Sequence, residues 1–313
     1  MQGTVPVHSS RLSGLLHAPE IRLSTREKIW GWLFIAPFLA FFSVFTLAPF
    51  GMAWWLSVVD WKPLGVTTFV GLSNYSKLFA MGSFRKALWN SFYYTVLTVP
   101  ASIFLALLTA VLIFSLRSST ARSFFQAVFY LPGLISGLAV AIIWRFIFDY
   151  EVGVLNYFVT SLFGIERVNW LGNVHTALPS LAGMAVLGGN GTAIIIFVAA
   201  LSSIPKDLYD VASIDGAGFW RRHLSVTLPL ITPSFLYVLV MSTLGALQVF
   251  TPVYVLTGGG PVYSTMTAGY FIYNRLVFYG DAGSAAGGGL VLLLITVGLT
   301  IVQFRSFSQV SEF

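Results

Sequence analysis

A few uncharged polar side chains lie inside otherwise apolar stretches of this 313-residue chain. Asn190 and Thr192 interrupt one such stretch, and Ser242 and Gln248 interrupt another. Amide and hydroxyl groups exchange hydrogen bonds without carrying charge, so together with aromatic faces they suit an uncharged, hydroxyl-rich ligand. The alternative is that they hydrogen-bond neighbouring helices, in bonds of about 1 kcal/mol each. The sequence leaves both interpretations open.

Groups that carry out covalent chemistry are scarce in the apolar part of the chain. There is no cysteine, which excludes disulfides and thiolate metal sites, and no Gly-Lys pair, which excludes a phosphate-binding P-loop. The histidines fall in predicted tails or loops: His8, His17, His175 and His223. An intramembrane enzyme or a proton relay needs ionisable groups at depth. We therefore predict no catalytic residue and no metal site.

The segment 202–229 is a polar stretch between two apolar ones. Pro205 suits the first turn of a helix, and Asp207 complements the positive end of the helix dipole. A short helix to about Ile214 is expected, followed by a tight turn at Gly216 and a second helix. Apolar side chains of this helix-turn-helix can fill a groove on a partner protein: Tyr209, Ala212, Ile214 and Phe219. The alternative is an ordinary amphipathic loop.

The composition indicates that these residues are positioned by membrane-spanning helices. Hydrophobic residues make up 57% of the chain and charged residues only 9%, with a mean hydropathy of +0.83. A bilayer core about 30 Å thick requires roughly 20 consecutive apolar residues per helix. Six charge-free gaps are long enough, and they hold 31, 30, 22, 38, 52 and 23 residues: 29–59, 87–116, 123–144, 168–205, 223–274 and 282–304.

We predict an all-α, polytopic membrane protein with about six transmembrane helices. The expected helices are 29–56, 87–117, 124–148, 178–201, 230–250 and 286–304. In stretches such as 32–45, both the odd-numbered and the even-numbered positions are apolar. This pattern disfavours the strands of a β-barrel, in which apolar and polar residues alternate. Pro37 and Pro49 are expected to kink the first helix unless neighbours satisfy the freed carbonyls. Gly188 to Gly191 is expected to interrupt the fourth, and 154–163 to form a short interfacial helix.

The distribution of Lys and Arg predicts that both termini are cytoplasmic. With that orientation ten of the seventeen basic residues fall inside, a modest bias of the expected sign. The predicted organisation is a cytoplasmic tail over 1–28, one transmembrane domain over 29–304 that includes the cytoplasmic loop 202–229, and a cytoplasmic tail over 305–313. Basic residues beside anionic lipid account for the net charge of +6 without a nucleic-acid partner.

The loop carries a recognisable pattern. The run Asp210-Val-Ala-Ser-Ile-Asp-Gly-Ala217, continuing to Val226-Thr-Leu-Pro229, resembles the EAA loop of bacterial ABC importer permeases. It departs from that pattern at Asp210, where Glu is usual, and at Val211, where Ala is usual. In that family the loop docks into the ATPase subunit and transmits its closure to the membrane helices. The resemblance therefore implies an ATPase-coupling role for seven residues: Tyr209, Asp210, Ala212, Asp215, Gly216, Ala217 and Phe219.

Two further motifs resemble carbohydrate-uptake permeases of the maltose and glycerol-phosphate type. They are Phe69-Val-Gly-Leu-Ser-Asn-Tyr75 with Asn90 and Ser91, and Leu256-Thr-Gly-Gly-Gly-Pro261 with Thr265 and Tyr273. The resemblance implies a second homologous permease, a cytoplasmic ATPase dimer that holds ATP and Mg²⁺, an extracytoplasmic solute-binding protein and a location in the bacterial inner membrane. It also places Gly189, Thr192, Ser242, Ala246 and Val249 near that family's substrate-contacting positions.

The expected function follows from these resemblances. The chain is expected to be a non-enzymatic permease subunit that binds no cofactor itself and translocates an oligosaccharide, sugar or sugar phosphate. The candidate substrate-binding residues are Gly189, Asn190, Thr192, Ser242, Ala246, Gln248 and Val249. An uncharged pathway suits a neutral, hydroxyl-rich solute. The alternatives are a secondary transporter or channel that works without ATP, and an intramembrane enzyme, which the missing catalytic groups disfavour.

Overall fold

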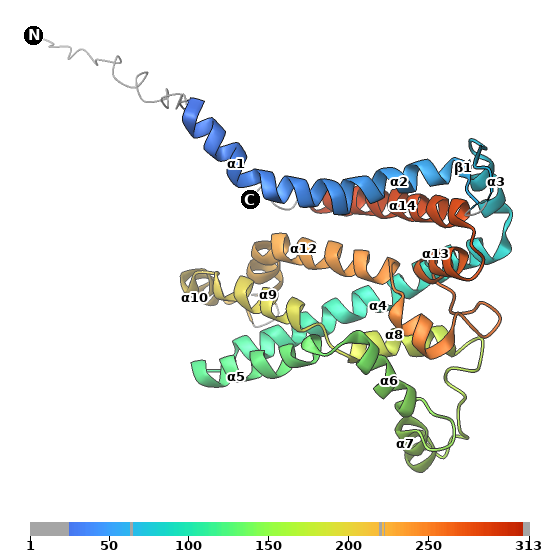
Figure 1. The fold of residues 1–313 in the computed structure, drawn as a ribbon. Helices are drawn as coiled ribbons and strands as arrows, with labels where there is room; N and C mark the ends of the chain where they lie inside the picture. The colour runs from blue at the N-terminus through green and yellow to red at the C-terminus, as the bar shows by residue number, and fades with distance from the viewer. Residues whose placement is uncertain (1–24, 63–64, 219–220, 222, 309–313) are drawn as a thin grey trace, which may run out of the picture. The chain divides into compact units, whose positions relative to one another are not determined.

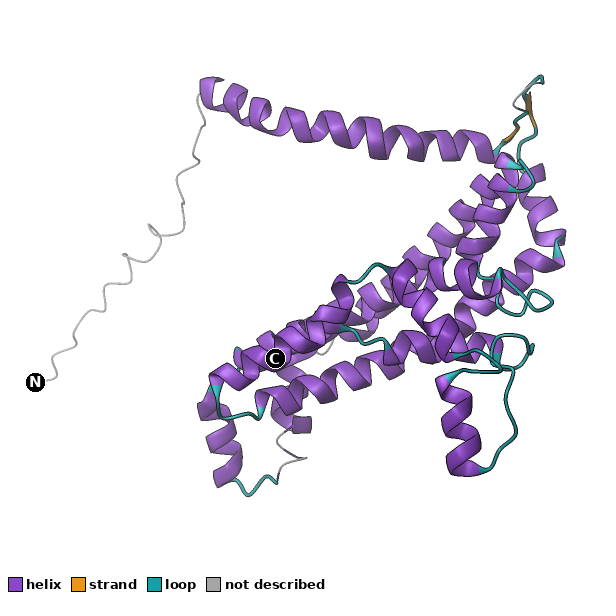
Figure 2. Ribbon diagram, turned by 60° about the horizontal axis from the view of Figure 1, so that its bottom comes forward, coloured by secondary structure: helices purple, strands orange, loops and turns teal. Residues whose placement is uncertain are grey.

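The computed structural model describes residues 25–62, 65–218, 221 and 223–308. In this part nearly all regular structure is helical (Figure 2). Sheet is limited to two antiparallel two-residue strands, β1 (Val59–Asp60) and β2 (Thr68–Phe69), with Val59 opposite Phe69. The all-α prediction is confirmed. Most of the tails predicted for 1–28 and 305–313 lies outside the described residues.

The chain divides into two units, residues 1–52 and 53–313. The described part of the first unit comprises α1 (Thr25–Phe42), a π-helical turn η1 (Ser43–Leu47) and the start of α2 (Ala48–Ser57). Pro49 has no backbone N–H, and its ring crowds the carbonyl of Phe45 four residues earlier. Phe45 lies in the π-helical turn η1, in which the Ala48 N–H donates to the carbonyl of Ser43, five residues earlier. This wider turn makes room for the proline ring, so helical structure continues through Pro49. The expected first helix therefore forms without a break.

The second unit is a bundle of helices. Its elements are α3 (Ser73–Ala80), α4 (Gly82–Phe114), α5 (Ser119–Tyr130), η2 (Leu131–Leu134), α6 (Gly137–Ile147), α7 (Val154–Phe163), α8 (Ala177–Leu187), α9 (Gly191–Ser202), α10 (Lys206–Ile214), η3 (His223–Thr227), α12 (Leu228–Leu247), η4 (Val253–Thr257), α13 (Ala268–Val277) and α14 (Ala282–Ser308). Helices α4, α9 and α12 pack against one another, with α10 near one end and α13 near the other (Figure 1). We call these ends the α10 end and the α13 end.

Four described helices are long and apolar enough to cross a membrane, and the number rises to six if two bent helix pairs each count as one span. The single helices are Thr25–Ser57, Gly82–Phe114, Leu224–Leu247 and Ala282–Phe307. The pairs are the α5–η2 segment with α6, and α8 with α9. The prediction of about six spans agrees with this number when each bent pair counts as one span. The predicted interruption of the fourth is a 45° bend between α8 and α9.

The third span differs from its prediction. A single helix over 124–148 is wrong, because α5 and α6 are separated by the 3₁₀ turn η2 and bend by 91°. The break itself is at Ile135 and Ser136, whose ψ angles of 137° and 131° are not helical, shortly after Pro132 in the η2 turn. An isolated proline in an apolar run does not distinguish a mild kink from a complete break, and here the chain breaks.

Two large apolar clusters, and a smaller one around Ala141, Phe148 and Met184, hold the bundle together. The cluster nearer the α10 end is built from α4, α9 and α12, and includes the fully buried Phe197, Leu201 and Ile231. The other large cluster includes Leu78, Phe84 and Phe271, in which helices α3, α4 and α13 meet. Phe84 and Phe271 are in ring contact, with centroids 5.1 Å apart. A cavity lies between the two large clusters, lined by Val99 of one and Tyr94 of the other.

A buried asparagine organises the loop around α7, the helix predicted at 154–163. The Asn156 amide nitrogen donates to the carbonyls of Tyr150 and Val168, and its oxygen accepts from the Trp170 ring N–H. Asp149 ends the preceding segment, and its carboxylate accepts from the N–H groups of Val152 and Glu151. These bonds hold the pKa of the Asp149 carboxyl below its usual value.

Candidate functional site

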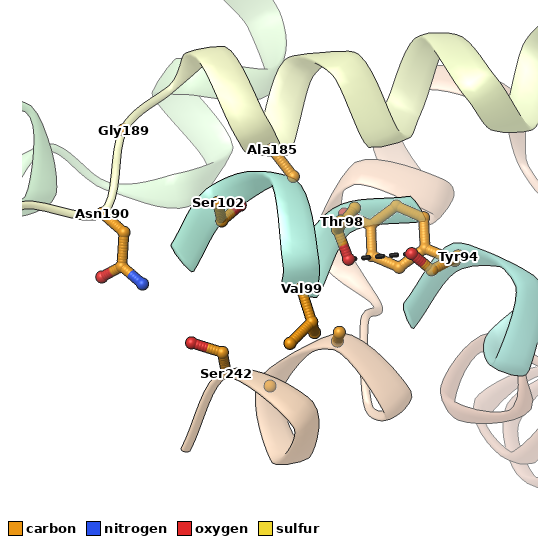
Figure 3. Close-up of a pocket in the computed structure, with 10 residues that line it drawn as sticks. Tyr94, Thr98, Val99, Ser102, Ala185, Gly189, Asn190 and Ser242 are labelled. Carbon is orange, nitrogen blue, oxygen red and sulfur yellow. Dashed lines mark hydrogen bonds between the residues drawn. The ribbon is translucent and has the colours of Figure 1, made fainter. Parts of the chain in front are cut away.

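A cavity of about 230 Å³ opens between α4, the α8–α9 break and α12. Its lining carries hydroxyl and amide groups but no charged side chain: Tyr94, Thr98, Val99, Ser102, Ala185, Gly189, Asn190, Ser242, Gly245 and Ala246 (Figure 3). Such a lining can hydrogen-bond an uncharged, hydroxyl-bearing ligand. It offers no counter-charge to an anion, which would be costly to desolvate there.

The break between α8 and α9 creates one wall of this cavity. Gly189 has φ +78°, a conformation that L side chains rarely adopt, so glycine suits the turn. Asn190 caps α9 by accepting a hydrogen bond from the Ala193 N–H at 3.2 Å, and its amide nitrogen points toward the cavity (Figure 3). A Cβ on Gly191 would lie 2.6 Å from the Phe129 carbonyl oxygen. The glycine therefore lets α9 start directly against α5.

Helix α4 supplies the facing wall. Tyr94, Thr98 and Ser102 repeat every four residues, which places them on one face of the helix (Figure 3). The Thr98 hydroxyl donates to the Tyr94 carbonyl at 2.8 Å, so its oxygen is still able to accept a bond from a ligand. The sequence analysis missed these residues. A polar stripe at a spacing of four in an apolar helix is the signal that could have found them.

The structure brings together four of the seven candidate substrate-binding residues: Gly189, Asn190, Ser242 and Ala246. The other three do not line the cavity. Thr192 is exposed on the first turn of α9, and Gln248 is exposed just after α12 ends. Val249 packs half-buried into the apolar cluster near the α13 end. Each of these three lies within one helical turn of a residue that lines the cavity, Asn190 or Ala246.

The turn after α10 has the bonding of a Schellman motif. The Ala217 N–H donates to the Ala212 carbonyl at 2.9 Å, and the Gly216 N–H donates to the Ser213 carbonyl at 3.1 Å. Gly216 has φ +73°, which L side chains disfavour. The short helix and the glycine turn are therefore present where the sequence predicted them. Phe219, also expected to take part in docking, lies outside the described residues.

Helix α10 has one face packed on its own chain and one face free of the described residues. Tyr209 packs against the cluster nearer the α10 end, and its hydroxyl lies 3.0 Å from the Thr227 hydroxyl. Leu208, Val211 and Ile214, spaced three residues apart, are exposed, and Ile214 is 84% exposed. Asp210 and Asp215 are exposed beside this apolar row. Of the expected docking residues, Tyr209 thus anchors the helix, and the apolar row faces outward.

Two sequence motifs that are about 170 residues apart meet at the α13 end. The Asn90 amide nitrogen donates to the carbonyls of Tyr263 and Met266, at 2.8 and 2.9 Å. Ser91 accepts a bond from the Ala268 N–H at 2.9 Å. Within the loop the Thr265 hydroxyl donates to the Gly260 carbonyl at 2.7 Å. Asn90 and Ser91 therefore fix the glycine-rich loop against the start of α4.

Comparison with known proteins gives a consistent result. The profile of the family described as "Binding-protein-dependent transport system inner membrane component" matches residues 70–307. The chain is 32% identical to the probable ABC transporter permease protein YesP of Bacillus subtilis, with 90% of this chain and 92% of that protein covered. It is 33% identical to the arabinooligosaccharides transport system permease protein AraP of Bacillus subtilis, with 89% and 88% covered.

A third relative is the sn-glycerol-3-phosphate transport system permease protein UgpA of Yersinia pestis, 33% identical, with 88% of this chain and 92% of that protein covered. Among solved structures, a chain of a bacterial alginate ABC transporter in complex with an alginate pentasaccharide-bound periplasmic protein superposes with a TM-score of 0.76. That chain is 22% identical, with 92% of this chain and 96% of that chain covered. The structural likeness concerns the fold.

Proposed function

This chain belongs to the family of binding-protein-dependent transport system inner membrane components, and from that membership we propose that it forms half of the membrane pore of an ATP-driven importer for neutral carbohydrates. It is a permease subunit of an ABC importer. The observation that carries the finer proposal is the cavity between α4, α9 and α12, whose polar groups are all uncharged.

The proposed cargo is a neutral oligosaccharide or sugar. Relatives are named for the transport of arabinooligosaccharides and of sn-glycerol-3-phosphate, which supports a carbohydrate-like cargo in general. A phosphate or carboxylate in the cavity would lose hydration without meeting a basic side chain. We propose that Tyr94, Asn190 and Ser242 hydrogen-bond the cargo as it passes.

The proposed assembly contains three kinds of partner. A second homologous permease completes the pore, an extracytoplasmic binding protein delivers the sugar, and a cytoplasmic ATPase dimer binds ATP and Mg²⁺. This chain is proposed to bind no cofactor and to carry out no hydrolysis. The exposed apolar row of α10, Leu208, Val211 and Ile214, supports the ATPase contact, because an amphipathic helix of this kind fits a hydrophobic groove.

The orientation follows from the same assignment. We propose that the α10 end faces the cytoplasm and that the α13 end faces the binding protein. The modest excess of Lys and Arg in the segments assigned to the cytoplasm supports this orientation. Both chain termini are then cytoplasmic.

Transport in reconstituted vesicles tests the function. The assembled transporter is expected to import at least one of maltotriose, cellotriose or arabinotriose, only with its binding protein outside and with ATP and Mg²⁺ inside. Glycerol 3-phosphate is expected to enter at background level, because the cavity offers it no cation. Uptake without ATP would make the protein a secondary transporter or channel, and preferential uptake of glycerol 3-phosphate would contradict a neutral cargo.

A further inference from the structure

Four aromatic rings gather at the α13 end, on the segment that follows the cavity. Phe250 lies between α12 and η4, Tyr254 lies in η4, and Tyr270 and Tyr273 come from α13. Tyr254 stacks on Phe250 with ring centroids 5.5 Å apart and planes inclined by 13°. Tyr273 meets Tyr254 edge-on at 5.4 Å, and Tyr270 lies at 6.2 Å. We call these four residues the aromatic platform.

The outermost ring of the platform, Tyr254, is only partly covered by the other three. Tyr254 stacks on Phe250 and also contacts the rings of Tyr270 and Tyr273, yet the residue is 45% exposed. Tyr270, in contrast, is only 6% exposed. The ring of Tyr254 is thus supported from behind and at its edges, and its remaining surface is accessible.

The glycine-rich loop explains how this support is built. Gly259 has φ +81°, and a Cβ there would lie 2.8 Å from the Cε1 atom of Tyr270. Only a glycine lets the loop backbone lie flat on the Tyr270 ring. The loop itself is held by the Asn90 amide. The loop therefore fixes Tyr270, and Tyr270 in turn packs against Tyr254 and Phe250.

The platform is continuous with the cavity. Ser242 and Ala246 line the cavity near the end of α12, and Phe250 follows three residues after α12 ends. Tyr94 from the cavity and Tyr270 from the platform belong to one apolar cluster, which also contacts Ala246 and Phe250. The platform is thus linked to the cavity by packed side chains.

From this geometry we propose that the aromatic platform is a second carbohydrate subsite, in which a sugar ring packs against the exposed part of the Tyr254 ring before it enters the cavity. The C–H bonds on the apolar face of a pyranose or furanose carry small positive charges, and an aromatic face carries negative charge density. The hydroxyls of neighbouring tyrosines can receive the sugar's polar edge. This inference rests on the proposed function, since it names an additional site on the same transport path.

The test measures sugar uptake by the assembled transporter with different side chains at position 254, using the trisaccharide that the wild type imports. It distinguishes the need for a flat aromatic ring from the need for an apolar side chain of any shape. Tyr254→Ala and Tyr254→Leu are expected to lower uptake about 2- to 12-fold, the range that corresponds to one aromatic contact. Tyr254→Trp is expected to retain uptake, because it keeps a flat aromatic face. Stimulation of ATP hydrolysis by the binding protein is expected to stay near the wild-type level in all three.

Tyr157→Ala is the matched control. Tyr157 is a tyrosine of α7 that is 69% exposed and meets Phe158 edge-on, but it has no stacked ring behind it. Its replacement is expected to leave uptake unchanged. Wild-type uptake by Tyr254→Leu would show that the tyrosine only anchors the protein at the membrane surface. A loss of ATP hydrolysis in parallel with uptake in the Tyr254 variants would show a structural role. Either result overturns the proposed subsite. If the wild type imports no sugar, the proposed function falls as well.

Discussion

Gly216→Val is expected to abolish sugar uptake while the protein still inserts into the membrane. Gly216 has φ +73°, where an L residue costs about 1–2 kcal/mol and a β-branched one is a rare outlier. The valine would disrupt the two hydrogen bonds that close the turn after α10, from Gly216 to Ser213 and from Ala217 to Ala212. The exposed row that ends at Ile214 would then be presented at a different angle. The loop lies outside the candidate spans, so insertion is not affected.

A matched substitution two residues further along the chain distinguishes the loss of the positive-φ turn from the mere addition of a larger side chain. Gly218 has no positive φ, and a Cβ there meets open space, so Gly218→Val is expected to preserve uptake. Both variants are measured in vesicles with binding protein and ATP, together with their yield in the membrane fraction. Uptake by Gly216→Val at the wild-type level would remove the turn from the coupling mechanism.

Gly245→Phe is expected to block transport by filling the cavity. Gly245 lines the cavity, and no atom lies within 4 Å of the Cβ position, so the new ring would extend into the space that the sugar needs. Overpacking costs about 1–3 kcal/mol, which corresponds to a loss of roughly 5- to 150-fold in affinity for the cargo. The measurement is the rate of uptake at several sugar concentrations.

The control for this variant is Gly298→Phe. Gly298 lies on α14, is exposed and does not line the cavity, and its Cβ position is equally open. It places the same ring in a membrane helix away from the proposed path, so uptake is expected to persist. Equal uptake by the two variants would show that cargo does not pass through this cavity.

Much of the fold could be predicted because its causes are local. Six long charge-free stretches are sufficient to predict six spans, and Gly188 to Gly191 cannot easily continue a helix, so the break between α8 and α9 was predictable. The break at Ile135 and Ser136, shortly after Pro132, was not, since proline inside a membrane helix leads to either a kink or a full bend. Which one occurs depends on the neighbouring helix, here α9, which starts against Phe129.

The candidate site, too, could be predicted only in part. Asn190 and Ser242 were found because polar residues are conspicuous in apolar stretches, but Thr192 and Gln248 were equally conspicuous and lie away from the cavity. Whether such a residue faces the cavity depends on where its helix ends. Gln248 follows the last turn of α12, where the direction of the side chain no longer follows the helical spacing. Likewise, the amphipathic pattern of α10 did not reveal that Tyr209 bonds Thr227 and faces its own chain.

The central claim is that α10 contacts an ATP-hydrolysing subunit, and cross-linking from Ile214 tests it most directly. The chain has no cysteine, so Ile214→Cys introduces a single thiol at its most exposed apolar position in α10. A short thiol-to-amine reagent applied to the assembled transporter is expected to join this residue to the ATPase, whereas Tyr157→Cys on α7 is expected to give no such product. A cross-link to the ATPase from Tyr157→Cys and none from Ile214→Cys would contradict the account.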